Sequence, residues 1–63
     1  ALDDAQRLVL DAVPAERGAA AEFVARTAGM ALTHTRTCLE DLARLGFVEF
    51  GESGWRLTSL ALR

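Results

Sequence analysis

The sequence predicts a winged helix-turn-helix, a small α+β fold in which three helices are followed by a two-stranded β-hairpin wing. Two observations support this prediction. Apolar residues recur at helical spacing in three segments between residues 2 and 45, separated by turns that contain Gly18 and Gly29. After Gly46 the pattern changes to two short alternating runs, "FVEF" and "WRLT", joined by "GESG", whose glycines suit a hairpin turn. A plain three-helix bundle is the main competing fold.

The segment "LDDAQRLVLDAVP" is predicted to form the first helix. Asp3 is placed as the N-cap residue, Gln6 lies three residues later as its capping-box partner, and Pro14 stops the helix. Four apolar residues form one stripe that is expected to face the core: Leu2, Val9, Leu10 and Val13. Leu8 falls on another side of the helix, so we expect it to be exposed.

The second helix is expected over Ala20–Ala28, with Gly29 as a left-handed C-cap. Its inner face is made of residues small enough for a neighbouring helix to approach closely: Ala21, Val24, Ala25 and Ala28. Phe23 points the other way. This helix should therefore pack tightly on one face and expose one aromatic ring on the other.

The third helix is expected over Leu32–Leu45 and should end at Gly46, where the chain turns into the wing. The residues predicted to face inward are Thr35, Cys38, Leu39, Leu42 and Leu45. In the hairpin, Trp55 should cover the base of the wing as a core residue, and stacking on a nucleic acid is the less favoured interpretation.

Composition and charge limit the classes of function. The net charge is -2 and the pI is about 5.2, whereas a domain that holds duplex DNA unaided is usually basic. No apolar run is long enough to span a membrane, no signal-peptide pattern is present, and Cys38 is the only cysteine, so a cytoplasmic location is expected. Residues 1–63 should form one domain, and the start at Ala rather than Met suggests a fragment of a larger protein.

Four stretches of the sequence, "LDDAQRLVLDAVP", "AAAEFVARTAGM", "LEDLARLGFVEF" and "GWRL", resemble the C-terminal winged-helix tail of the DNA-processing protein A family (DprA/Smf). In that family a larger Rossmann-like domain binds single-stranded DNA during natural transformation and recombination, and the tail is an accessory module. The resemblance therefore implies a part of such a protein, without the single-strand-binding activity. Two residues depart from the family pattern: Phe23 replaces a charged residue, and Thr35 replaces Val or Ile. Bacterial transcription regulators share much of the same pattern.

If the third helix enters a major groove, its exposed N-terminal residues Thr33, Arg36 and Thr37 should meet base edges. Arg56 in the wing would contact the adjacent backbone, and Arg44 is a further candidate. A structural interpretation is favoured for the charges, because Arg36, Glu40 and Arg44 are spaced to form an ion-pair ladder on a solvated helix face. Glu40 and Asp41 would also repel phosphates from this surface.

A metal site and a catalytic site are both weakly indicated. His34, Cys38 and Asp41 are spaced to lie on neighbouring turns of one helix, but a closed zinc site normally has four ligands and Cys38 is expected near the core. One His and one Cys without an orienting third group do not make a nucleophilic site. We therefore expect no enzyme activity, no metal, no cofactor and no small-molecule substrate.

Leu8 and Phe23 are the candidates for a protein interface, because both project away from the predicted core. The sequence thus favours an accessory module that acts mainly by protein contact, with weak DNA contact at most. Its partner would be the core domain of the parent protein, a second copy of this chain or a recombination protein, and no membrane contact is expected. The alternative is the DNA-binding domain of a transcription regulator.

Overall fold

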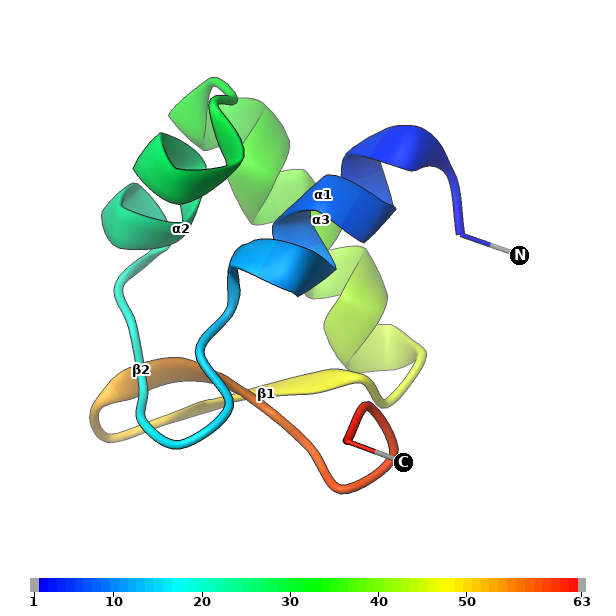
Figure 1. Ribbon diagram of the computed structural model, residues 1–63, viewed down its shortest axis with the longest axis vertical. Helices are drawn as coiled ribbons and strands as arrows, with labels where there is room; N and C mark the ends of the chain where they lie inside the picture. Colours follow the sequence, from blue (N-terminus) through cyan, green and yellow to red (C-terminus); the bar gives the residue numbers. More distant parts are fainter. Residues whose placement is uncertain (1, 63) are drawn as a thin grey trace.

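The computed structural model describes residues 2–62 and has three helices followed by an antiparallel hairpin. The elements are α1 (Asp4–Ala12), α2 (Ala21–Ala28), α3 (Leu32–Arg44), β1 (Val48–Gly51) and β2 (Gly54–Leu57). Each helix packs against the other two, and the hairpin lies at one end of the helices, at the bottom of Figure 1. The winged helix-turn-helix is therefore confirmed, and the hairpin excludes a plain three-helix bundle.

α1 begins with the predicted capping box. The Gln6 backbone N–H donates to Asp3 Oδ1 over 2.7 Å, and the Asp3 backbone N–H donates to Gln6 Oε1 over 3.1 Å. The helix ends at Ala12, because a residue that precedes proline, here Val13, is driven out of the helical conformation. Val13 is buried, whereas Leu8 is 51% exposed, as its position outside the apolar stripe predicts.

α2 is one residue shorter than predicted, since Ala20 is extended and forms the N-cap. Gly29 takes the predicted left-handed conformation with φ of 70°, and the Met30 amide donates to the Ala25 carbonyl over 3.0 Å. The small residues Ala21, Val24 and Ala25 are buried. Together with α1 and α3 they enclose the apolar core.

α3 buries four of the five residues predicted to face inward: Thr35, Cys38, Leu39 and Leu42. The prediction for Leu45 is wrong, because its side chain is 53% exposed. The helix ends at Arg44, Leu45 is already the cap residue, and Gly46 reverses the chain with φ of 89°. Leu45 keeps a helical backbone, and its amide donates to the Asp41 carbonyl over 3.1 Å, so its side chain still follows the helix. It is exposed because the rest of the fold does not cover this position at the end of α3.

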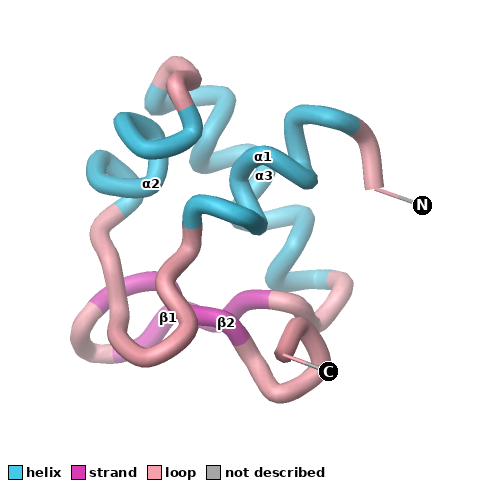
Figure 2. Tube along the Cα trace, in the orientation of Figure 1, coloured by secondary structure: helices cyan, strands magenta, loops and turns pink. Residues whose placement is uncertain are grey.

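The wing pairs Val48 with Leu57 and Phe50 with Trp55, and Glu52 and Ser53 form the tip between Gly51 and Gly54. A third segment that the sequence did not predict joins it. Ala19, in the connection between α1 and α2, exchanges backbone hydrogen bonds of 2.8 and 2.7 Å with Trp55. Figure 2 shows this connection running down beside the strands. A single paired residue has no periodicity, so no sequence pattern identifies it.

The tail after β2 is hydrogen-bonded to the connection between α3 and β1. The Thr58 amide donates to the Phe47 carbonyl over 3.0 Å, and the Thr58 hydroxyl donates to the Gly46 carbonyl. The turn that follows lies beside the corner between α3 and β1 (Figure 1). Within residues 2–62, none of the helices has both the length and the apolar content needed to cross a membrane.

Candidate functional site

The exposed face of α3 brings together four of the five residues that the sequence predicts for DNA contact, and the fifth, Arg56, lies on β2. The side chains that share this face by helical spacing, all exposed, are Thr33, Arg36, Thr37, Glu40 and Arg44. The Thr37 hydroxyl donates to the Thr33 carbonyl over 3.2 Å, so its proton is already engaged within the helix. The grouping on one helix face is as predicted, and DNA contact by these residues stays a prediction.

Each candidate arginine is paired with a carboxylate. Arg36 Nη2 lies 3.7 Å from Glu22 Oε2 of α2. Arg44 pairs with Asp41, and Arg56 Nε donates to Glu49 Oε2 across the hairpin over 3.0 Å.

The predicted ladder through Glu40 is therefore wrong. Arg36 turns towards α2 and Arg44 turns back to Asp41 three residues earlier. Glu40 forms no ion pair within residues 2–62. Sequence spacing identifies ion-pair partners only on the same helix. The packing of α2 against α3 brings the Glu22 carboxylate of another helix to Arg36.

The balance of charge on this surface is negative. On the α3 side, Arg36 and Arg44 are outnumbered by Glu22, Glu40 and Asp41. Arg56 and Glu49 form a separate pair, on the opposite side of the hairpin from Phe50 and Trp55. Because phosphate binding depends on neutralising DNA charge and releasing counterions, carboxylates on the same surface oppose it. The arginines alone would suggest a DNA-binding face, and their partners remove that charge.

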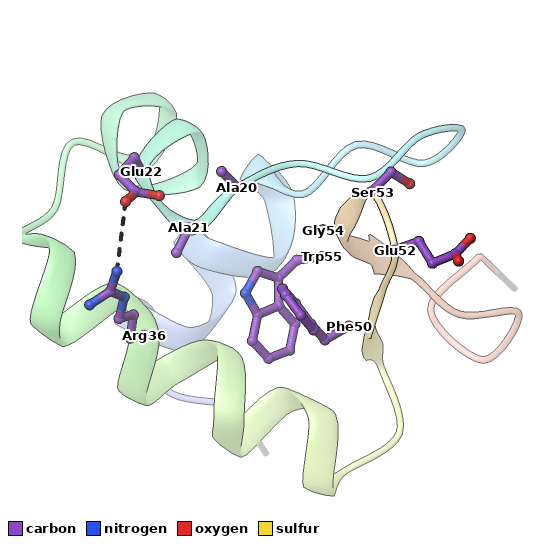
Figure 3. Close-up of a pocket in the computed structure, with 9 residues that line it drawn as sticks. All are labelled: Ala20, Ala21, Glu22, Arg36, Phe50, Glu52, Ser53, Gly54 and Trp55. Atoms are coloured by element: carbon purple, nitrogen blue, oxygen red, sulfur yellow. Dashed lines mark ion pairs between the residues drawn. The ribbon is translucent and has the colours of Figure 1, made fainter.

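A hollow of about 470 Å³ opens beside the Glu22–Arg36 pair, between the start of α2, α3 and the wing (Figure 3). Its wall includes Phe50 and Trp55, whose ring centres are 5.1 Å apart with the planes tilted by 60°. Trp55 is half-buried against the core, in keeping with its predicted place at the base of the wing. Phe50 is 69% exposed.

Sequence reasoning missed Phe50 as a site residue. Alternation along the strand places it on the same side as the buried Val48, which indicates a core position. Phe50 is nevertheless exposed because it lies near the tip of the wing, where the hollow separates it from the helices. Only its cross-strand pairing with Trp55 gives the two rings a shared surface.

The two candidate interface residues are both exposed. Leu8 lies on α1, and Phe23 lies on α2 with 38% of its surface exposed. The Arg17 guanidinium, from the connection before α2, stands 5.7 Å from the centre of the Phe23 ring. The predicted exposure is confirmed, and a role in partner binding stays a prediction.

The chemistry-bearing side chains of α3 do not converge. His34 is exposed, Cys38 is buried, and Asp41 is paired with Arg44. No group of three His, Cys, Asp or Glu side chains in the described part of the chain is placed to hold a metal ion. Burial raises the pKa of the Cys38 thiol, and the negative charges of Asp3 and Asp41 raise it further, so the reactive thiolate is disfavoured.

The fold and this surface define a winged-helix domain in which the helix expected to read DNA carries arginines neutralised by neighbouring acids. A scan against protein-family models and searches of curated proteins and solved structures found no match to the chain.

Proposed function

We propose that this winged-helix domain is an accessory module of a DprA-like DNA-processing protein, and that it acts mainly through protein contacts with at most weak DNA binding. The setting in DNA uptake and recombination rests on the resemblance of the sequence to the tail of that family. The observation that supports the mode of action is the pairing of Arg36, Arg44 and Arg56 with acids on the surface that would face DNA.

The strength of the ion pairs is not what opposes DNA binding. Exposed pairs of this kind contribute about 0–1 kcal/mol, so a phosphate could compete for each arginine. The carboxylates, however, stay on the surface after the arginines turn away, and they face the phosphates at short range. Glu40 adds a charge in the middle of the exposed face of α3. The free energy gained by counterion release is thereby reduced.

A titration with duplex DNA at low salt tests the absence of strong binding. We expect little binding, and a shallow dependence of the binding constant on salt concentration. A steep dependence, with a slope that Arg36→Ala reduces by about one phosphate equivalent, would contradict the proposal. That result would support the second candidate, a transcription regulator that reads DNA through Thr33, Arg36, Thr37 and Arg56.

The protein-contact part is tested at the exposed apolar residues. Leu8→Ala and Phe23→Ala should weaken self-association, or binding to the core domain of the parent protein, in sedimentation experiments. Leu45→Ala is a matched control, because Leu45 is as exposed as Leu8 but was not predicted as an interface residue. All three variants should keep the melting temperature of the parent chain. Equal effects of Leu8→Ala and Leu45→Ala would contradict a specific interface.

A further inference from the structure

The hollow between α2, α3 and the wing has an aromatic wall. Phe50 and Trp55 project from paired positions on the two strands towards α3, and their rings lie between the Glu22–Arg36 pair and the tip of the wing (Figure 3). Phe50 is the most exposed of the large apolar side chains in the described chain. An aromatic face that is open to solvent attracts a cation through the negative charge density of its π system.

The charges around the hollow favour the same kind of ligand. Among the described residues, Glu22 and Glu52 line it with a single arginine, Arg36, so these residues give the hollow a net negative charge. The 3.7 Å between Arg36 and Glu22 exceeds hydrogen-bond length, which leaves the Glu22 oxygens able to accept from another donor. Glu52 stands at the opposite edge with its carboxylate directed to solvent. A phosphate in the hollow would meet the Glu22 carboxylate, with the negative charge of Glu52 farther away at the edge.

We propose that this hollow binds an arginine side chain of a partner protein. The proposal rests on the proposed function in protein contact and names the chemistry of the partner. The planar guanidinium group stacks on the aromatic wall formed by Phe50 and Trp55, at the Trp55 end that lies nearer to Glu22, and pairs with the Glu22 carboxylate. Glu52 adds a more distant negative charge at the edge of the hollow. Arginine fits this site better than lysine, because its flat, weakly hydrated group both stacks and donates in a fixed geometry.

The direct probe is N-acetyl-argininamide, with N-acetyl-citrullinamide as a neutral analogue of nearly the same shape. Trp55 is the only tryptophan, so its fluorescence and its indole N–H resonance report on the hollow. We expect a saturable change with the arginine compound, with a dissociation constant on the order of millimolar for so small a ligand. The citrulline compound should give none. No change with either compound, or the same change with both, would overturn the proposal.

Three variants test the assigned contacts. Glu22→Gln and Phe50→Ala should each raise the dissociation constant about threefold, through loss of the ion pair and of the stacking surface. Arg36→Gln should lower it, also by about threefold, because it removes the cation that competes for Glu22. Asp11→Asn is the control, since this exposed carboxylate on α1 lies outside the hollow. The opposite response to Arg36→Gln would overturn the assignment.

A single-stranded oligothymidylate tests whether the hollow binds a nucleic acid instead of an arginine side chain. Saturation of the Trp55 signal by the oligonucleotide, weakened by Arg36→Gln, would overturn the proposal in favour of base stacking. A signal that depends on the concentration of the protein alone would assign the hollow to a second copy of the chain and overturn it likewise. If the hollow does not bind the arginine compound, the proposed function is still supported as long as duplex DNA binds weakly and Phe23→Ala weakens association.

Discussion

Glu22 on α2 and Arg36 on α3 face each other with 3.7 Å between Oε2 and Nη2. The two residues are far apart in the sequence, and only the packing of the helices brings them together. The contact places an acid beside the α3 arginine that the sequence predicts to meet base edges. In the same way, Asp41 lies beside Arg44 and Glu49 lies beside Arg56.

Removing these three acids should turn the domain into a DNA-binding protein. The combined variant Glu22→Gln, Asp41→Asn and Glu49→Gln takes three negative charges from a domain with net charge -2. We expect the affinity for duplex DNA at low salt to rise about tenfold or more, with a steeper salt dependence, because the carboxylates that repel phosphates beside Arg36, Arg44 and Arg56 are removed. A fluorescence anisotropy titration at several salt concentrations measures both quantities.

The control for that variant changes the same net charge elsewhere. Asp4→Asn, Asp11→Asn and Glu16→Gln remove three exposed acids that pair with none of the candidate arginines. This control should gain much less affinity. An equal gain would mean that net charge alone limits DNA binding, and that the local ion pairs have no specific role.

Gly54→Ala should destabilise the wing strongly. Gly54 has φ of 113°, and a Cβ atom there would lie 2.5 Å from the Ala19 carbonyl oxygen. The strained backbone and the clash should together lower the free energy of unfolding by about 2 kcal/mol or more, measured by urea denaturation. Gly51→Ala is the matched control, because Gly51 has no positive φ and a Cβ atom there would meet nothing within 4 Å. Similar losses in the two variants would contradict the assigned cause.

Thr35→Val should stabilise the domain. Thr35 is fully buried, and its hydroxyl oxygen has no hydrogen-bond partner among the described residues. Replacing the hydroxyl by a methyl group of similar size removes an unsatisfied polar atom, so the free energy of unfolding should rise by about 1 kcal/mol. Thr37→Val, on the exposed face of the same helix, should change it by less than about 0.5 kcal/mol. A loss of stability in Thr35→Val would show that the hydroxyl has a partner.

Stability should fall in alkaline solution because of Cys38. Its pKa is raised in the folded state above the ordinary value of 9.0, chiefly by burial, so between these two pKa values the folded chain binds more protons than the unfolded chain. The free energy of unfolding therefore decreases as the pH rises above about 9. The chain contains no tyrosine and no lysine, so the thiol is the only side chain that titrates in this window.

Cys38→Ala is the control for the alkaline prediction, and urea denaturation at pH 8 to 10.5 is the measurement. The variant will be less stable at pH 8 because it loses buried volume. Its stability should depend less on pH than that of the parent chain. An equally steep fall in the variant would assign the pH dependence to another group.

The sequence by itself determined the order of the elements and most of the core. Local spacing predicts the capping box of Asp3 and Gln6 and the left-handed Gly29, because these features depend on residues within about one turn of helix. Helical periodicity predicts the inward positions of α3 as far as Leu42. The same reasoning failed at Leu45, because spacing gives the direction of its side chain but not whether another segment covers it.

Only the tertiary structure decided which charged and aromatic side chains lie together on the surface. The bridge between Ala19 and Trp55, the pairing of Arg36 with Glu22 and the shared surface of Phe50 and Trp55 all join residues from different segments. Periodicity assigns a side chain to a face of its own helix or strand, but it does not say which segment lies opposite. The neutralised arginines and the aromatic hollow depend on which segment lies opposite, and the packing of the helices and the hairpin sets that.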